Sequence, residues 1–183
     1  MKNAVLVVDD EPQVIRAIAR ALLDEDIEVS GATCAEQAQA LLAGGAFKAV
    51  ISDQQMPGME GSEFLAWVSL RHPEVVRIML TGHATLSGIM EAVNRGEIYR
   101  FFTKPWSDLE LRFALRAAME KFDLETRVRR LMTVARCQTY RLRQLEAQHP
   151  GITRLRRQDG AHDLTMPAAE EIDDLLRELG VER

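Results

Sequence analysis

Cysteines and long apolar runs are the features that this chain lacks most clearly. Its two cysteines, Cys34 and Cys137, are isolated from each other and from any histidine or cysteine cluster. That pattern excludes a disulfide framework and a zinc site, and we expect both thiols to be reduced. Charges interrupt every apolar run before the roughly 20 residues of a membrane helix, and the first residues lack a signal-peptide pattern. We therefore expect a cytoplasmic protein.

The composition indicates a folded protein with one main core. At 46% hydrophobic and 28% charged residues, the chain is unlike a disordered one. Its 183 residues are enough for one well-buried domain and an appendage. Charge is unevenly distributed: residues 121–157 hold ten basic and three acidic side chains, whereas residues 159–183 hold two basic and eight acidic ones. The net charge of -5 therefore hides two segments of opposite sign.

Short apolar runs alternate with segments of helical period over the first 120 or so residues. This alternation predicts an α/β fold whose parallel sheet is buried on both faces. The predicted strands are residues 4–8, 27–33, 49–52, 76–80 and 99–103, and the predicted helices are residues 12–22, 35–42, 62–70 and 86–94. Five strands thus alternate with helices.

A long last helix is predicted over residues 107–148, because Ser107 and Asp108 suit a helix start and no proline or glycine follows before Pro150. Apolar positions alternate by four and three residues from Leu124 to Leu145, which predicts a coiled-coil homodimer through residues 117–146. Met132 and Val134 widen the stripe, so a four-helix bundle competes with a simple dimer.

The remaining residues are predicted to form a linker over 149–166 and a short amphipathic helix over 167–180. Because residues 159–183 are acidic and residues 121–157 are basic, docking of this last segment on the long helix, or on a partner protein, is a further hypothesis.

Polar residues collect where the predicted strands end. Asp9 and Asp10 follow the first strand, Asp53 ends the third, Thr81 the fourth and Lys104 the fifth. The carboxyl ends of parallel strands share one edge, so these side chains should converge there. Three carboxylates about 5 Å apart would repel by roughly 3 kcal/mol per pair, and therefore need a cation. Oxygen ligands without histidine or cysteine favour Mg²⁺.

Such a site suits phosphoryl transfer to a carboxylate, with the metal and Lys104 stabilising the oxygens of the transferred group. Asp53 is the predicted nucleophile, because the loop after it contains Pro57, Gly58 and Gly61 and leaves its side chain open. The Thr81 hydroxyl is placed to donate a hydrogen bond to one of those oxygens.

Four motifs, at residues 7–12, 52–59, 80–83 and 102–105, resemble the receiver domains of two-component response regulators. The resemblance covers about residues 1–122. It implies a doubly wound (βα)5 fold with strand order 2-1-3-4-5, a histidine kinase that phosphorylates Asp53, and no catalysis beyond self-phosphorylation and self-dephosphorylation.

The same resemblance implies roles for single residues. Asp10, Asp53 and the backbone carbonyl of Gln55 would bind Mg²⁺, and Asp9 would act through water. Thr81 and Phe101 would form a switch pair, and the bond before Pro105 would be cis. Without the resemblance, an aromatic residue at a strand end such as Phe101 is more often a core residue.

The leading prediction is therefore a response regulator that signals by phosphorylation-dependent dimerisation or contact with an unknown downstream protein. One alternative is a transcriptional regulator that binds DNA with its basic helix, although nothing after residue 122 resembles a helix-turn-helix. Another is the sensory fragment of a longer regulator or phosphodiesterase.

Overall fold

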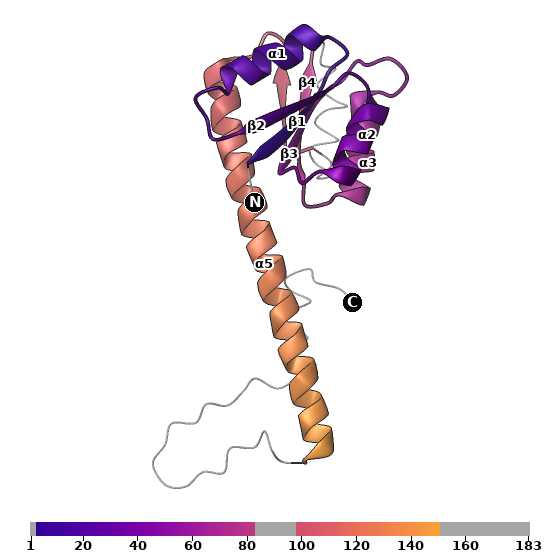
Figure 1. Cartoon of the computed structure of the whole chain (residues 1–183), viewed down its shortest axis with the longest axis vertical. Helices are drawn as coiled ribbons and strands as arrows, with labels where there is room; N and C mark the ends of the chain where they lie inside the picture. Colours follow the sequence, from indigo (N-terminus) through magenta and orange to yellow (C-terminus); the bar gives the residue numbers. More distant parts are fainter. Residues whose placement is uncertain (1–2, 83–97, 151–183) are drawn as a thin grey trace. The chain divides into compact units, whose positions relative to one another are not determined.

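The computed structural model describes residues 3–82 and 98–150, and these form a parallel sheet covered by helices (Figure 1). The strands are β1 (Ala4–Val8), β2 (Glu28–Ala32), β3 (Ala49–Asp53), β4 (Val76–Thr81) and β5 (Arg100–Thr103). The helices are α1 (Pro12–Ala21), α2 (Ala35–Gly44), α3 (Gly61–Arg71) and α5 (Asp108–Gln148). The helix predicted over residues 86–94, residues 151–166 of the predicted linker and the predicted helix over 167–180 lie outside the described residues.

The sheet has the order β2-β1-β3-β4-β5 and all its neighbouring strands are parallel. This confirms the predicted fold class and strand order. The strand bounds agree with the sequence patterns to within one residue: β2 is one residue shorter at each end than predicted, and β5 begins at Arg100 instead of Tyr99.

The apolar strands have two buried faces, which explains why their sequences lack polar alternation. Val5 and Val7 of β1 belong to a core cluster with residues of α1 and α5. Leu6 and Val8 point to the opposite face and join a cluster with residues of α2 and α3. Figure 1 shows the same layering, with α2 and α3 side by side on one face of the sheet.

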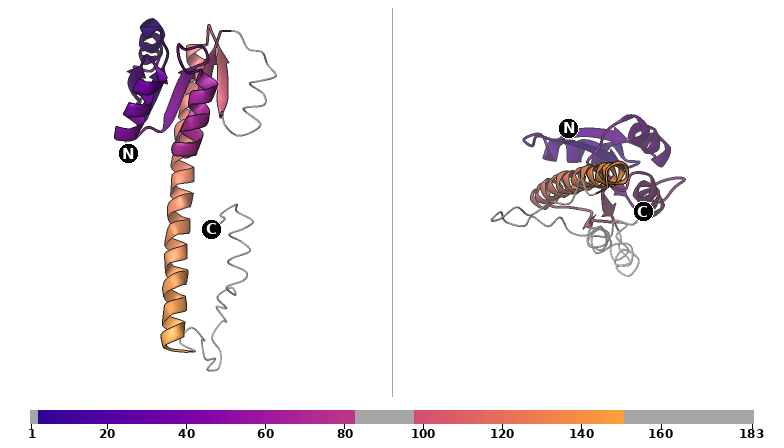
Figure 2. Two further views of the ribbon diagram at one scale, coloured as in Figure 1. Left: turned by 90° about the vertical axis from the view of Figure 1, so that its right-hand side faces the viewer. Right: turned by 90° about the horizontal axis from the view of Figure 1, so that it is seen from below.

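Helix α5 begins where the sequence predicts. The Glu110 N–H donates to Ser107 Oγ at 3.4 Å, and the Leu111 N–H donates to the Ser107 carbonyl at 2.9 Å. Its buried residues recur at helical spacing along one face: Leu111, Ala114, Leu115, Ala118, Met119 and Phe122. The helix continues unbroken beyond this stretch (Figure 2), although its apolar anchoring on the sheet ends at Phe122.

The chain divides into two compact units, residues 1–133 and 134–183, with the boundary inside α5. The sheet and its covering helices belong to the first unit. The described part of the second unit consists mainly of the remaining turns of α5, in which Val134, Tyr140 and Leu145 are exposed. No helix within residues 3–82 and 98–150 is long and apolar enough to cross a membrane.

A tight loop follows β3 and closes back on it. The Gln54 N–H donates to the Leu80 carbonyl at 2.8 Å, and the Gly61 N–H donates to the Gln54 carbonyl at 3.0 Å. A side chain at Gly61 would overlap the carbonyl oxygen of Asp53 and would lie 2.9 Å from the Cα atom of Gln54. Both neighbours are backbone, so they cannot rotate away, and only glycine fits there.

We predict that Gly61→Ala lowers the free energy of unfolding by about 1 to 3 kcal/mol, because the methyl group forces the backbone of the loop apart. The control is Gly44→Ala, since a methyl group at Gly44 meets no atom within 4 Å and Gly44 lies at the end of α2. Urea denaturation of both variants measures the difference. Equal stability of Gly61→Ala and the wild type would contradict the packing described here.

Candidate functional site

The residues at the carboxyl ends of the strands are held there by hydrogen bonds that extend the sheet. The Asp9 N–H donates to the Ala32 carbonyl at 3.1 Å, just after β1. The Lys104 N–H donates to the Thr81 carbonyl at 2.8 Å, just after β5. Asp53 is the last residue of β3 and pairs in register with Leu80. One edge of the sheet therefore carries Asp9, Asp53, Thr81 and Lys104, as predicted from the parallel topology.

The ammonium group of Lys104 joins two of the carboxylates at this edge. Its Nζ donates to Asp9 Oδ2 at 2.8 Å and lies 2.5 Å from Asp53 Oδ1. The Asp9 side chain is 0% exposed and the Asp53 side chain 6%, whereas Lys104 retains 22%. A buried carboxylate needs a paired charge, and a single lysine supplies it to both.

The other carboxylate oxygens accept hydrogen bonds from backbone amides. The Glu11 N–H donates to Asp9 Oδ1 at 2.9 Å, and the Gln55 N–H donates to Asp53 Oδ2 at 2.7 Å. Asp53 therefore has both oxygens fixed in direction, one by Lys104 and one by the loop that follows β3.

Burial and charge oppose each other in this cluster. Burial, together with the nearby charge of Asp53, raises the pKa of Asp9 above its usual value despite the lowering by Lys104 and by the Glu11 amide. Burial alone would lower the pKa of Lys104, but its hydrogen bonds to Asp53 and Asp9 outweigh burial and leave that pKa raised. Lys104 is therefore a firmly charged ammonium beside two carboxylates that one cation does not fully neutralise.

The other predicted site residues lie around this cluster. Asp10 and Gln55 are exposed, and Thr81 is buried at the end of β4. Phe101 lies on β5 opposite Met79 of β4, is half-buried, and packs against the core cluster on the α2 and α3 face. The bond between Lys104 and Pro105 is cis, and this confirms what the family resemblance implied.

The carboxylate oxygens at this edge are ligands of the type that Mg²⁺ prefers. Asp9, Asp10 and Asp53 bring three formal negative charges and Lys104 one positive charge, and the three carboxylates offer oxygen ligands. Within the described residues, however, no three His, Cys, Asp or Glu side chains gather closely enough to hold a metal ion. Lys104 is the cation that holds Asp9 and Asp53 in this arrangement, and Asp10 lies outside its contacts.

One residue with a comparable charge arrangement was not predicted from the sequence. Lys48, at the opposite end of β3, is buried and forms an ion pair with Asp123 of α5 at 2.7 Å. Its immediate neighbours Phe47 and Ala49 are apolar and carry no signal of a polar contact. The only clue is that Lys48 interrupts an otherwise apolar run.

Comparisons with known proteins find relatives that are named transcriptional regulatory proteins. The chain is 39% identical over 144 residues to the hydrogenase transcriptional regulatory protein HoxA of Cupriavidus necator, an alignment covering 79% of this chain and 30% of that protein. It is 30% identical over 162 residues to the C4-dicarboxylate transport transcriptional regulatory protein DctD of Pseudomonas aeruginosa, covering 87% of this chain and 34% of that protein. The chain thus spans about a third of the length of these curated relatives.

A solved structure and a family description complete the comparison. The signal receiver domain of an HD domain-containing protein from Pseudomonas fluorescens Pf-5 is 36% identical with a TM-score of 0.65, and the match covers 69% of this chain and 93% of that one. The family described as the response regulator receiver domain matches residues 5–116, which include Asp9, Asp53, Thr81 and Lys104. The chain therefore belongs to the response regulator receiver family, and its receiver domain runs into the long helix α5.

Proposed function

We propose that this chain is a phosphorylation switch in which Asp53 accepts a phosphoryl group from a histidine kinase. The observation that carries the proposal is the contact of one lysine, Lys104, with two buried carboxylates from neighbouring strands. Membership of the receiver family supports a histidine kinase as the partner. The chemistry is then limited to self-phosphorylation and self-dephosphorylation.

Each residue of the site has its own role in the proposed phosphoryl transfer. A carboxylate oxygen of Asp53 attacks the phosphorus atom while the bond from phosphorus to its donor breaks, so that an acyl phosphate forms. Lys104, already 2.5 Å from Asp53 Oδ1, follows the new negative charge and pairs with a phosphoryl oxygen. The Thr81 hydroxyl donates to another phosphoryl oxygen, and Phe101 responds by turning inward as the second member of the switch pair.

Mg²⁺ belongs to this proposal as the counter-ion of the carboxylates. Asp10, Asp53 and the backbone carbonyl of Gln55 would hold it, with Asp9 acting through water. When bound, Mg²⁺ would stabilise the negative charge on the carboxylate and phosphoryl oxygens during transfer. Two observations support this assignment. One ammonium group, that of Lys104, pairs with two carboxylates, and the carboxylates offer oxygen ligands.

Helix α5 is the proposed output element, acting as a homodimerisation surface through residues 117–146. Beyond Phe122 it exposes large apolar side chains at heptad spacing: Leu124 is 64% exposed, Val128 41% and Leu131 69%. Leu145, farther along the same pattern, is 43% exposed. Apolar residues in such numbers on one face favour burial against another helix. A second copy in a parallel coiled coil, or in a four-helix bundle, meets that requirement.

The relatives favour a second possibility for the output. HoxA and DctD are named transcriptional regulatory proteins, and the chain matches about a third of each. The match to DctD spans 162 residues and thus extends beyond the receiver family match. These observations favour the sensory part of a longer regulator over direct DNA contact by the basic residues of α5. In both cases Asp53 remains the input and α5 the output.

The phosphoacceptor assignment predicts that acetyl phosphate with Mg²⁺ phosphorylates the wild type and Asp26→Asn but not Asp53→Asn. Asp26 lies between α1 and β2, at the far edge of the sheet, so it controls for the loss of one acidic charge. Lys104→Met should slow the reaction about a hundredfold, because a cation on the transferring oxygens is lost. Intact-protein mass spectrometry follows the product. Phosphorylation of Asp53→Asn at the wild-type rate would refute the assignment.

The metal assignment predicts that Mg²⁺ stabilises the folded chain. At a concentration one hundred times its dissociation constant, the free energy of unfolding should rise by about 2.7 kcal/mol, because only the folded site binds the ion. Asp10→Asn should lose most of this gain, whereas Asp24→Asn in the loop after α1 should keep it. Thermal denaturation with Mg²⁺ and with a chelator provides the measurement. An equal gain in both variants would exclude Asp10 as a ligand.

The dimer assignment predicts that beryllofluoride with Mg²⁺ shifts the wild type towards a dimer. Leu131→Glu places a charge in the apolar stripe and should weaken dimerisation at least about tenfold, which is about 1.4 kcal/mol. Thr133→Glu adds the same charge two residues away, outside the stripe, and should dimerise like the wild type. Light scattering after gel filtration measures both. If Leu131→Glu dimerises as the wild type does, this stripe is not the interface.

A further inference from the structure

The segment of α5 just after Phe122 has little apolar anchoring, so polar contacts decide how it is attached to the receiver domain. Phe122 is the last residue of α5 that is buried in the core. Residues 123–133 still belong to the same compact unit as the sheet. Contacts other than core packing must therefore fasten this segment.

Lys48 is a buried cation that reaches this segment. Its backbone lies inside the sheet: the Lys48 N–H donates to the Ala4 carbonyl at 2.9 Å, and its own carbonyl accepts from the Val76 N–H at 2.9 Å. Lys48 thus continues β3 at its amino end, between β1 and β4. The side chain starts from a rigid position and is 4% exposed.

The ammonium group of Lys48 contacts two residues of α5 and the residue before β1. Its Nζ donates to Asp123 Oδ2 at 2.7 Å and lies 2.7 Å from the other carboxylate oxygen. It also donates to Asn3 Oδ1 at 2.8 Å and lies 5.9 Å from the centre of the Phe122 ring. We call these four residues, Asn3, Lys48, Phe122 and Asp123, the Lys48 latch. Displacing this buried ammonium is costly, because it would lose its ion pair, its hydrogen bond and its contact with the ring at once.

Three other ion pairs of α5, described within residues 3–82 and 98–133, do not replace the latch. Arg116 binds Glu25 through two nitrogens at 2.7 and 2.8 Å, but it precedes Phe122, where core packing already holds the helix. Arg129 reaches Glu74 at only 3.5 Å, and both side chains are largely accessible to solvent. The pair of Lys121 and Glu125 lies within α5 and attaches it to nothing else.

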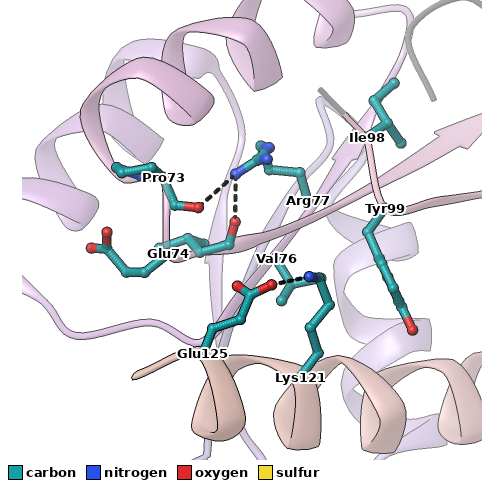
Figure 3. Close-up of a pocket in the computed structure, with 9 residues that line it drawn as sticks. Pro73, Glu74, Val76, Arg77, Ile98, Tyr99, Lys121 and Glu125 are labelled. Carbon is teal, nitrogen blue, oxygen red and sulfur yellow. Dashed lines mark hydrogen bonds and ion pairs between the residues drawn. The ribbon is translucent and has the colours of Figure 1, made fainter. Parts of the chain in front are cut away.

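A hollow beside α5 leaves this segment unsupported on one side. A cavity of about 340 Å³ separates Lys121 and Glu125 of α5 from Val76 of β4 and from Ile98 and Tyr99, which precede β5. Figure 3 shows Lys121 and Glu125 on the α5 side of this cavity, with Tyr99 and Val76 opposite. The cavity gives α5 room to move on this side, and the shortest ion pair that holds the segment after Phe122 is that of Lys48 with Asp123.

We propose that Lys48 is the positioning residue that couples the phosphorylation site to the output helix. This coupling role rests on the proposed function, because it assumes that Asp53 is the input and α5 the output. Strand β3 carries Asp53 at one end and is preceded by Lys48 at the other, and all five of its residues are buried. A displacement of β3 at the phosphorylation edge is passed by Lys48 to Asp123, and from there to residues 124–133.

The test uses the full chain with Lys48→Met, which keeps the apolar stem and removes the charge. Amide hydrogen exchange in residues 123–133 should accelerate about tenfold, whereas exchange in residues 111–119 stays unchanged, because core packing holds those. Beryllofluoride with Mg²⁺ should no longer change the oligomeric state. Acetyl phosphate should still phosphorylate Asp53 at the wild-type rate. Arg116→Met, which removes another cross-element ion pair, is the matched control and should behave like the wild type.

Asp123→Asn is the second variant, and it removes the charge from the exposed side of the latch if Lys48→Met fails to fold. It should show the same acceleration and the same loss of response. Unchanged exchange in residues 123–133, or a full response to beryllofluoride in the latch variants, would overturn the proposal. A wild type that takes no phosphoryl group would instead refute the proposed function, so the two failures are distinguishable.

Discussion

The contact of Lys104 with Asp9 and Asp53 is the constraint on which the candidate site depends. The two carboxylates are almost fully buried and poorly solvated, and each lies within ion-pair distance of the same ammonium group. The parallel topology supplies that cation, since it brings the ends of β1, β3 and β5 to one edge of the sheet. The same arrangement fixes both oxygens of Asp53 and holds a positive charge beside them.

Strand β3 runs from this edge towards the contact with α5 at its other end. Its five residues are all buried, and it carries Asp53 at one end and continues from Lys48 at the other. Each end of the strand is thus bound by a lysine: Lys104 contacts Asp53, and Lys48 contacts Asp123 of α5. The apolar strand between them is stiff because helices cover both of its faces. In the proposed coupling, a change at Asp53 reaches α5 through this strand and Lys48.

Much of the fold follows from local patterns in the sequence. The uninterrupted apolar runs predicted strands buried on both faces, and β1 and β4 begin where expected. The start of α5 at Ser107 and Asp108 also followed from residue type alone, because a hydroxyl side chain bonds the amides of a first helical turn. The gathering of Asp9, Asp53 and Lys104 followed from parallel topology, since strand ends share an edge.

Other features depend on three-dimensional contacts that no local pattern encodes. The adjacent residues Asp9 and Asp10 look equivalent in sequence, yet one is buried beside Lys104 and the other is exposed. The partner of Lys48 lies 75 positions later, on a helix whose register against the sheet must be known first. The contact of Gly61 with the Asp53 carbonyl likewise arises from the path of a loop.

A double-mutant cycle on Lys104 and Asp9 tests the central interaction most directly. Urea denaturation in the absence of divalent cations would give the unfolding free energies of the wild type, Lys104→Met, Asp9→Asn and the double variant. If Lys104 neutralises the buried carboxylates, its loss costs about 3 to 5 kcal/mol in the wild type and clearly less in Asp9→Asn, by at least about 1 kcal/mol. The same cost in both backgrounds would show that the two groups are not coupled and would contradict the account.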